Sequence, residues 1–255
     1  MGKSSFRDQR YIVLNSLSRK SKTFSRVLTF FGRPNSYSLL NMDYVLCNIL
    51  GENGYYVELG ANDGLRQSNT LKLERELGWK GILIEPLTYQ YKQLKRNRKG
   101  NVIVNAACVP YEYGSTTIPI YDGDLMTTTE LSSDEIPQFV SWSDIGRRYE
   151  GEENRERSVD SPALTLNSIF ELADAPKQIG FLSLDVEGAE LPVLSGVNHD
   201  FYRFGLIMIE SRNASKTISY LKTRNYEFLC FISKNDMLFL DVSRVDIPEL
   251  KLKIV

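Results

Sequence analysis

The chain has 255 residues, with 42% apolar and 25% charged side chains, which is typical of a globular protein and excludes a wholly disordered or fibrous one. No run of about 18 uncharged apolar residues occurs, so the sequence predicts no transmembrane helix. The net charge of −1 excludes a generic binder of polyanions.

The charge is unevenly distributed along the chain. Residues 1–33 hold eight Lys or Arg side chains against one acid, Asp8, so the rest of the chain is net negative. Two interpretations stay open: a solvated arm, or a contact with an anionic membrane surface or a phosphorylated acceptor. We therefore expect a basic N-terminal arm over residues 1–35 and one folded domain over residues 36–255. No apolar signal-peptide core follows the first basic residues, so we expect no secretory signal.

The few cysteines and the single histidine argue against a zinc site. Cys47, Cys108 and Cys230 are scattered and form no C-x-x-C pair. Cys108 and Cys230 lie in apolar stretches, which predicts core thiols and suits a reducing, cytoplasmic location. His199 stands at the expected end of a helix, where a capping or surface role is more typical than that of a general base.

From residue 54 onward, short apolar runs alternate with helical patterns. The expected elements, in chain order, are strand Tyr55–Leu59, helix Asn69–Leu77 with Ser68 as its cap, strand Gly81–Ile84, helix Tyr89–Arg98, strand Val102–Asn105, strand Ile118–Tyr121, helix Leu166–Leu172, strand Phe181–Leu184, helix Ala189–Leu194, strand Leu206–Ile209, helix Ser215–Thr223, and strands Tyr226–Ile232 and Met237–Asp241. This alternation predicts an α/β fold with a mostly parallel sheet, helices on both faces and an antiparallel C-terminal hairpin strand.

Residues 122–160 break this alternation. They are rich in Ser, Thr, Asp, Glu and Gly and contain few long apolar runs. A connection of this length is usually functional or disordered. We expect an inserted loop or lid around residues 122–160 that closes over a ligand.

The segment Glu58-Leu-Gly-Ala-Asn-Asp-Gly64 follows the first strand and precedes a helix. Ligands bind an open α/β sheet at this position, beyond the carboxyl ends of the strands, and Gly60 lets the backbone approach a ligand without a Cβ atom. A phosphate-binding loop needs N–H donors, whereas this loop carries Glu58 and Asp63. It suits a cationic, hydroxyl-rich ligand such as S-adenosylmethionine better than a pyrophosphate. The alternative is a tight turn with surface acids.

Two further strand ends fit a nucleoside. Glu85 lies 21 residues after Gly64, and an acid at about 20 residues binds ribose hydroxyls in nucleotide-binding α/β folds. Dinucleotide enzymes share that acid, but the G-x-G-x-x-G pattern is missing here. In Asn105-Ala-Ala107 the small alanine side chains leave room for a purine. The Asn105 amide can both donate and accept hydrogen bonds. An exposed acid at Glu85 and simple tight packing at Asn105 are the alternatives.

Acids also follow the next two strands. Asp185 opens the segment Asp185-Val-Glu-Gly-Ala-Glu190, and Glu210 ends the following strand. We expect Asp185 to point into the crevice with Glu210 beside it. Both are candidate ligands for a divalent cation such as Mg²⁺, although two carboxylates alone are a weak metal signal. Glu187 and Glu190 lie near a helix N-terminus, where an acid is also structurally favourable.

With these residues in place, the chain resembles the FkbM family of S-adenosylmethionine-dependent methyltransferases over roughly residues 36–241. The matching segments are Gly54–Gly64, Ser68–Thr70, Gly78–Pro86, Asn105–Ala107 and Leu184–Glu190 with Glu210, preceded by a lead-in helix at Tyr37–Leu50 that contains Asp43.

The resemblance implies a class I methyltransferase (Rossmann-like) fold with a seven-stranded sheet, and methyl transfer to oxygen, often a hydroxyl of a sugar or of a glycosylated or polyketide natural product. It implies ribose binding by Glu85, an adenine site near Asn105 and Ala106, and Asp185 near the transferred methyl group. The cofactor-binding residues it implies are Glu58, Gly60, Ala61, Asn62, Asp63, Ser68, Glu85, Pro86, Asn105, Ala106 and Asp185. Some family members have a histidine after the acid of the fifth strand, where this chain has Ser211.

We hypothesise that Asp185 takes the acceptor proton or ligates a cation, supported by Glu187 and Glu210. A sugar or glycan hydroxyl is the favoured acceptor, and Trp142, Tyr149 and Tyr121 are candidates to stack on it. A non-sugar hydroxyl, a nicotinamide-dependent oxidoreductase and a non-catalytic nucleotide-binding protein are the alternatives. Basic and aromatic residues do not interleave beyond the arm, so we expect no nucleic-acid partner. The sequence leaves the oligomeric state open.

Overall fold

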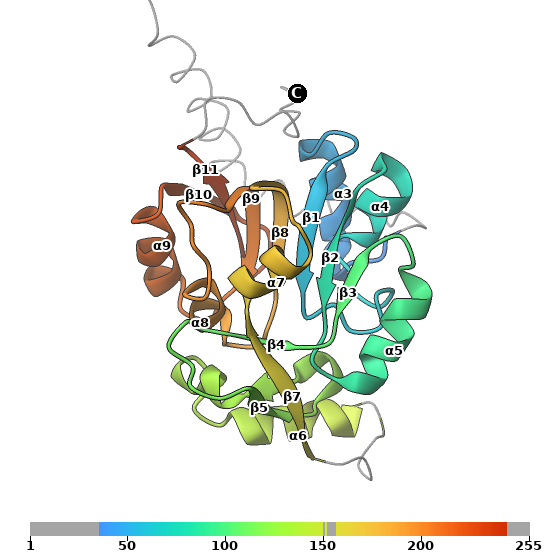
Figure 1. Ribbon diagram of the computed structural model, residues 1–255, viewed down its shortest axis with the longest axis vertical. Coiled ribbons are helices and arrows are strands. Elements are labelled where there is room, and N and C mark those ends of the chain that lie inside the picture. Colours follow the sequence, from blue (N-terminus) through green and yellow to red (C-terminus); the bar gives the residue numbers. More distant parts are fainter. Residues whose placement is uncertain (1–35, 150, 152–156, 244–255) are drawn as a thin grey trace, which may run out of the picture.

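The computed structural model describes residues 36–149, 151 and 157–243, and the basic arm predicted over residues 1–35 lies outside them. A seven-stranded sheet runs through the centre of the fold in the order β3-β2-β1-β8-β9-β11-β10 (Figure 1). The strands are β1 (Tyr55–Leu59), β2 (Lys80–Ile84), β3 (Val102–Val104), β8 (Gln178–Leu184), β9 (Arg203–Glu210), β10 (Tyr226–Phe231) and β11 (Asp236–Asp241).

The first five strands in this order pair in parallel, whereas β11 runs antiparallel to both β9 and β10. This is the mostly parallel sheet with an antiparallel hairpin strand that the sequence predicted. Together with the strand order, it is the sheet of a class I methyltransferase (Rossmann-like) fold.

Three helices cover each face of this sheet (Figure 1). One face carries α3 (Met42–Ile49), α4 (Leu71–Leu77) and α5 (Thr88–Asn97), after the short 3-10 turn η1 (Leu39–Asn41). The other face carries α7 (Leu166–Leu172), α8 (Glu190–Leu194) and α9 (Ala214–Lys222).

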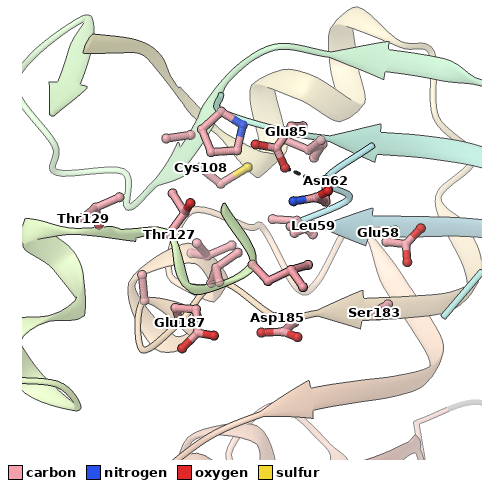
Figure 2. Close-up of a pocket in the computed structure, with 18 of the residues that line it drawn as sticks. Glu58, Leu59, Asn62, Glu85, Cys108, Thr127, Thr129, Ser183, Asp185 and Glu187 are labelled. Carbon is pink, nitrogen blue, oxygen red and sulfur yellow. Dashed lines mark hydrogen bonds between the residues drawn. The ribbon is translucent and has the colours of Figure 1, made fainter. Parts of the chain in front are cut away.

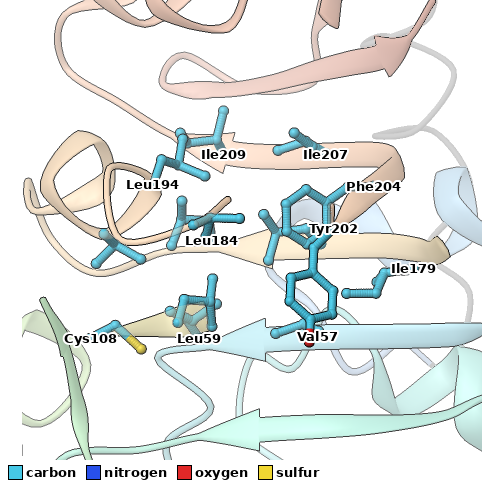
Figure 3. Packing of buried hydrophobic residues seen from close by; sticks show 14 of the residues in the cluster. Val57, Leu59, Cys108, Ile179, Leu184, Leu194, Tyr202, Phe204, Ile207 and Ile209 are labelled. Carbon is cyan, nitrogen blue, oxygen red and sulfur yellow. The ribbon is translucent and has the colours of Figure 1, made fainter. Parts of the chain in front are cut away.

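Alternation along the strands builds a separate core on each face. Val57 and Leu59 of β1 pack with the α7–α9 side (Figure 3), whereas Tyr56 packs with the α3–α5 side. Successive side chains of a strand point to opposite faces of the sheet. Because helices cover both faces, Tyr56, Val57 and Leu59 are all apolar or aromatic and all buried.

The expected helix Asn69–Leu77 begins two residues late, at Leu71. Ser68 still acts near its start, since its Oγ accepts the N–H of Leu71 at 3.1 Å. Gly78 ends the helix in the left-handed conformation, with φ of 70°, which a residue without Cβ adopts readily.

A second, four-stranded sheet lies beyond the carboxyl ends of the parallel strands, in the order β4-β7-β5-β6 (Figure 1). Its strands are β4 (Ala107–Val109), β5 (Thr117–Tyr121), β6 (Thr128–Thr129) and β7 (Ser158–Thr165), and it is accompanied by the 3-10 turns η2 (Asp124–Met126) and η3 (Glu130–Asp134) and by α6 (Phe139–Tyr149).

The segment expected to be a loop or lid around residues 122–160 is therefore largely built of regular structure. Helix α6 packs tightly on the turn before η2: a Cβ atom added to Gly146 would stand 2.1 Å from the carbonyl oxygen of Gly123. Closure of this segment over a ligand stays a prediction.

Three cysteines are free in the described chain. Cys108 is buried, as expected of a core thiol, whereas Cys230 is only half-buried. Among the described helices, none has both the length and the apolar composition needed to cross a bilayer.

The single histidine is a core residue. His199 is 8% exposed, and its Nε2 lies 3.0 Å from the carbonyl oxygen of Leu194. Its ring packs edge-on against Phe204, Tyr220 and Tyr226. Burial lowers the pKa of His199 to about 4, so the imidazole is neutral at physiological pH.

Because the chain has one histidine, its imidazole signals in a proton NMR spectrum need no further assignment. We expect them not to titrate between pH 8 and pH 5. In the unfolded chain the imidazole has its ordinary pKa of about 6.5. The stability that His199 contributes is therefore fully present above that pH and is lost as pH falls toward 4, by up to about 3 kcal/mol.

The variant His199→Gln serves as the control for this pH dependence. The buried carboxyls with raised pKa values favour folding at low pH and act in the opposite direction, so the comparison with the variant isolates the histidine. A histidine signal that titrates near its ordinary pKa would show that the ring is not buried as described.

Candidate functional site

A pocket opens between the carboxyl ends of β1, β2 and β8 and the segment from η2 to β6. Figure 2 shows Thr127 and Thr129 of that segment opposite the strand ends that carry Glu85 and Asp185. The cavity encloses about 940 Å³, including its open mouth. The predicted site residues that line it are Glu58, Gly60, Asn62, Glu85, Pro86, Ala106, Asp185 and Glu187. The others, Ala61, Asp63, Ser68, Asn105 and Glu210, do not line it.

Backbone contacts shape the loop after β1. Gly60 has φ of 73°, and a Cβ atom there would stand 2.0 Å from the carbonyl oxygen of Asp185. The loop after β1 and the end of β8 therefore touch backbone to backbone. Asn62 also has a positive φ, of 48°, and its N–H donates to Glu85 at 2.8 Å.

The Glu58 carboxylate is already saturated by the protein. It accepts hydrogen bonds from the hydroxyl of Ser68, from the N–H of Asn69 at 2.9 Å and from the hydroxyl of Thr70 at 2.6 Å. The buried guanidinium of Arg98 lies 3.7 Å away. Glu58 thus anchors the start of α4, and Ser68 takes part in the site through Glu58.

Asp63 caps its own turn rather than facing the pocket. Its Oδ1 accepts the N–H groups of Leu65 and Arg66, each at 2.8 Å. The two acids on which the sequence argument for a cationic ligand relied, Glu58 and Asp63, are therefore both engaged within the protein. The negative charge of the pocket comes from other carboxylates.

Asn105 also acts from behind the pocket wall. Its amide nitrogen donates to the carbonyl oxygens of Glu85 and Pro86, each at 2.9 Å. It holds the turn after β2, whereas Ala106, Ala107 and Cys108 form the apolar wall that reaches the cavity.

Glu85 is the acid that the end of β2 presents to the pocket. It is 4% exposed, and its two oxygens accept the N–H groups of Asn62 and Leu87, each at 2.8 Å. Burial, reinforced by the charges of Asp124 and Asp122, raises the pKa of Glu85 to about 7.

Asp124 is a pocket residue that the sequence interpretation missed. Its Oδ1 accepts hydrogen bonds from the amides of Asn62 at 2.8 Å and Gln90 at 3.1 Å, and its Oδ2 pairs with Arg66 at 3.2 Å. A sequence signal existed, because Asp122-Gly-Asp124 follows an apolar strand as the other site acids do.

Asn69 provides an unpaired acceptor in the pocket wall. Its amide nitrogen donates to the hydroxyl of Ser183 at 3.1 Å, while its Oδ1 is buried without a hydrogen-bond partner. A buried carbonyl oxygen left unpaired is unfavourable, and a ligand with an N–H donor would satisfy it.

The carboxylate oxygens of Asp185, Glu187 and Glu210 lie within 4.8 Å of one another, so the expectation that Glu210 lies beside Asp185 is confirmed. Asp185 is exposed to solvent where it reaches the pocket. Partial desolvation by the surrounding protein, with the charges of Glu210 and Glu187, raises the pKa of Asp185 above its usual range. Burial and the charge of Glu210 raise the pKa of Glu187 to about 7.

Glu190 holds the turn that carries these acids. Glu187 and Gly188 have φ of 51° and 93°, and the Oε1 of Glu190 accepts the N–H groups of Val186 and Gly188 at 3.1 and 3.0 Å. Burial raises the pKa of Glu190 to about 8. Its role is thus structural, as its place near a helix N-terminus indicated.

Residues after β6 and β9 enclose the cluster from the other side. Arg212 donates to Glu187 at 2.9 Å and stacks over the Trp142 ring at 4.8 Å. The Trp142 indole N–H donates to the same Glu187 oxygen at 3.0 Å. Glu135, after η3, accepts the Ser211 hydroxyl and the Arg212 N–H, so Ser211 is a structural residue here.

Of the three aromatic residues expected near an acceptor, Trp142 alone contacts this cluster. Tyr121 packs edge-on against Phe139, with ring centroids 5.2 Å apart, and Tyr149 is 84% exposed. None of the three lines the pocket.

A family model described as "Methyltransferase FkbM domain" matches residues 58–228, about two thirds of the chain. The matched range contains every predicted cofactor-binding and carboxylate residue. Among curated proteins, the Signal recognition particle 19 kDa protein of Pyrococcus abyssi is 35% identical over 82 residues, which are 30% of this chain and 78% of that protein. The family model is the longer of the two matches, and its range includes the residues that line the pocket.

Among solved structures, a methyltransferase FkbM from Methylobacillus flagellatus KT matches with a TM-score of 0.44 and 11% identity, over 89% of this chain and 60% of that chain. A TehB-like SAM-dependent methyltransferase from Corynebacterium glutamicum matches with a TM-score of 0.42 and 10% identity, over 88% and 98%. TrmK of M. capricolum, in complex with S-adenosyl-homocysteine, matches with a TM-score of 0.38 and 8% identity, over 78% and 67%.

The contact between the loop after β1 and the end of β8 is testable through Gly60→Ala. The added methyl group would meet the Asp185 carbonyl oxygen, and the positive φ disfavours any residue with a Cβ. We expect a loss of about 2 kcal/mol or more in unfolding free energy, measured by urea denaturation.

Gly100→Ala is the matched control, because a Cβ at Gly100 meets nothing within 4 Å. We expect it to change stability by less than about 0.5 kcal/mol. Equal stability of the two variants would contradict the described backbone contact.

Proposed function

Because this chain belongs to the FkbM methyltransferase family, we propose that its pocket binds S-adenosylmethionine and that it transfers the methyl group to a hydroxyl of a sugar or glycan. The observation that carries the proposal is the arrangement of two acids at the ends of β2 and β8, the two strands that flank β1. Glu85 and Asp185 face one cavity, one suited to ribose hydroxyls and the other to a reacting hydroxyl.

The residues of the pocket fit the donor at three points. Glu85 accepts the ribose hydroxyls, as acids at the end of the second strand do in nucleotide-binding folds. The apolar wall of Ala106, Ala107 and Cys108 takes the adenine ring. The unpaired Oδ1 of Asn69 accepts a hydrogen bond from the α-amino group. An unpaired acceptor at this place favours a ligand group that donates an N–H over a ligand carboxylate, which can only accept.

The loop after β1 brings the donor close to the strand ends. Gly60 and Asn62 line the cavity. At Gly60 the backbone of Asp185 is so close that no side chain larger than hydrogen fits. Glu58, Ser68 and Asp63 support that loop through the contacts described above, the N–H of Ala61 donates to the carbonyl oxygen of Ile84 at 3.2 Å, and Asn105 supports Pro86. In this proposal they shape the donor site without presenting their polar groups to it.

When bound, S-adenosylmethionine supplies a methyl group from its sulfonium to the acceptor oxygen by in-line displacement. Alignment of two reactants can supply about 7–11 kcal/mol of the barrier. A general base supplies about 10²–10⁴-fold, or roughly 3–5 kcal/mol. Positioning therefore outweighs proton transfer, and a single carboxylate suffices for the base.

Asp185 is the group proposed to accept the proton of the hydroxyl. Within the described chain no donor hydrogen-bonds its carboxylate, which leaves both oxygens available to a ligand in the pocket. Its raised pKa strengthens it as a proton acceptor. Glu187 and Glu210 stand beside it as supporting carboxylates.

Trp142 supports a sugar as the acceptor. Its ring lies beside the Asp185–Glu187–Glu210 cluster, and aromatic side chains that combine an apolar face with a polar tip suit sugar rings. Three free thiols in the described chain are in keeping with our proposal of a reducing, cytoplasmic location.

Glu85→Gln tests the donor site. Since the pKa of Glu85 is about 7, its ionised, hydroxyl-binding form increases between pH 6 and pH 8, and we expect wild-type affinity for S-adenosylmethionine to rise over that range. The variant should bind about 10–100-fold more weakly, as expected for loss of charged hydrogen bonds, and with a flatter pH dependence. Isothermal titration calorimetry measures both.

The matched control is the exposed Glu171→Gln, which should leave affinity unchanged. NAD should give no heat with the wild-type protein. Binding of NAD in place of S-adenosylmethionine and S-adenosylhomocysteine would contradict the proposed donor.

Asp185→Asn tests the proposed base in a methyl-transfer assay with labelled donor, a panel of nucleotide sugars and glycans, and mass spectrometry of the product. We expect wild-type product with one added methyl group on a sugar hydroxyl. The variant should lose about 10²–10⁴-fold in kcat while binding the donor with similar affinity.

Asp174→Asn, an exposed change after α7, is the control for the same amide substitution. Unchanged kcat in Asp185→Asn would exclude Asp185 as the base. Product from non-sugar hydroxyls alone would exclude the sugar acceptor.

A further inference from the structure

The carboxylates of Asp185, Glu187 and Glu210 repel one another, and a nearby positive charge would relieve that repulsion. One oxygen from each lies within 4.8 Å of the others, and like charges at this distance repel. A divalent cation with oxygen ligands is one solution, and the sequence suggested it for Asp185 and Glu210. A basic side chain is the other.

Arg212 already occupies that position. Its Nη2 donates to the Oε2 of Glu187 at 2.9 Å, and its Nη1 lies 3.8 Å from the Oε2 of Glu210. The guanidinium thus bridges two of the three acids. Asp185 is left as the carboxylate that faces the pocket without a hydrogen-bonded partner in the described chain.

The guanidinium is held in place rather than free to swing away. It stacks over the Trp142 ring at 4.8 Å, and its side chain is 23% exposed. Its backbone N–H donates to Glu135 at 2.8 Å, which ties residue 212 to the segment after η3. Trp142 also donates to Glu187 at 3.0 Å, so the acid and the guanidinium are fixed by the same ring.

This arrangement disfavours a metal ion at the cluster. The Oε2 of Glu187 already accepts two hydrogen bonds. An ion bound to that oxygen at the usual distance of about 2.0–2.6 Å would lie within roughly 5 Å of the guanidinium nitrogen and be repelled by it. Three more acids lie nearby: Glu190, Glu135 and Asp236. They add negative charge around the Asp185–Glu187–Glu210 cluster but contribute no candidate metal ligand to it.

We propose that Arg212 is a positioning residue that serves as the resident cation of this cluster in place of a divalent metal. Its single positive charge offsets part of the negative charge of Glu187 and Glu210 and leaves Asp185 as the reactive carboxylate. This role rests on the proposed function only for its effect on turnover. The charge compensation itself is a property of the protein alone.

The first test measures Mn²⁺ binding to the metal-stripped full chain by calorimetry and by electron paramagnetic resonance. We expect no saturable site in the wild-type protein or in Arg212→Lys, which keeps the charge. Arg212→Met should gain affinity for Mn²⁺ by at least about tenfold, because a unit charge within 5 Å has been removed. The double variant Arg212→Met/Asp185→Asn should lose that gain.

Arg224→Met is the matched control, since Arg224 stacks on Tyr220 and makes no contact with the cluster. A wild-type Mn²⁺ site that Asp185→Asn abolishes would overturn the proposal, and so would folded Arg212→Met with wild-type affinity for Mn²⁺. If Arg212→Met does not fold, the wild-type and Arg212→Lys measurements still decide between a metal and the guanidinium.

The second test separates a positioning role from a merely structural one. We expect EDTA to leave wild-type methyl transfer unchanged, and Arg212→Met to lower kcat at least tenfold with an unchanged Kd for the donor. Arg212→Lys should restore part of that loss. Loss of wild-type turnover in EDTA, restored by Mg²⁺, would overturn the proposal. Absence of methyl transfer from the wild type would contradict the proposed function but leave the Mn²⁺ result standing.

Discussion

The carboxyl ends of parallel strands meet at one edge of the sheet, and in this protein that edge gathers negative charge into a single pocket. Each carboxylate there is compensated differently: Glu58 by Arg98 and hydroxyl donors, Asp124 by Arg66 and two amides, and Glu85 by two backbone N–H groups. Buried charges without such partners would be strongly unfavourable. Asp185 differs because it faces the cavity without a hydrogen-bonded partner in the described chain, and our proposal that it is the base rests on that difference.

The second sheet and its helices hold this arrangement together. Glu135, after η3, accepts hydrogen bonds from Ser211 and Arg212, and Ile136 packs on Gly188, where a Cβ atom would approach to 3.1 Å. The segment around residues 122–160, which interrupts the strand–helix alternation, therefore packs against the turns after β8 and β9. It forms the pocket wall opposite the strand ends, so that wall is built by residues far from the strand-end acids in sequence.

Much of the fold and of the donor side of the pocket could be predicted because their signals are local. The apolar strands, the glycines that need a positive φ and the acid at each strand end all stand within a few residues of one another, and parallel topology then brings the strand ends together. The partners of those acids could not be predicted. Arg98 reaches Glu58 from the end of α5, and Asp124 reaches Asn62 across the pocket, because such pairs depend on packing rather than on spacing.

The sequence by itself determined the sheet, the edge at which the pocket lies and the strand-end acids Glu85, Asp185 and Glu210, since periodicity and turn residues act over short stretches of chain. Only the tertiary structure decided what each acid does. It bound Glu58 to the start of α4 and Asp63 to its own turn, placed Glu187 against Trp142 and inserted Arg212 between Glu187 and Glu210. The physical reason is that the charge state and availability of a carboxylate depend on its neighbours in space and on its access to water, and neither is encoded in its neighbours along the chain.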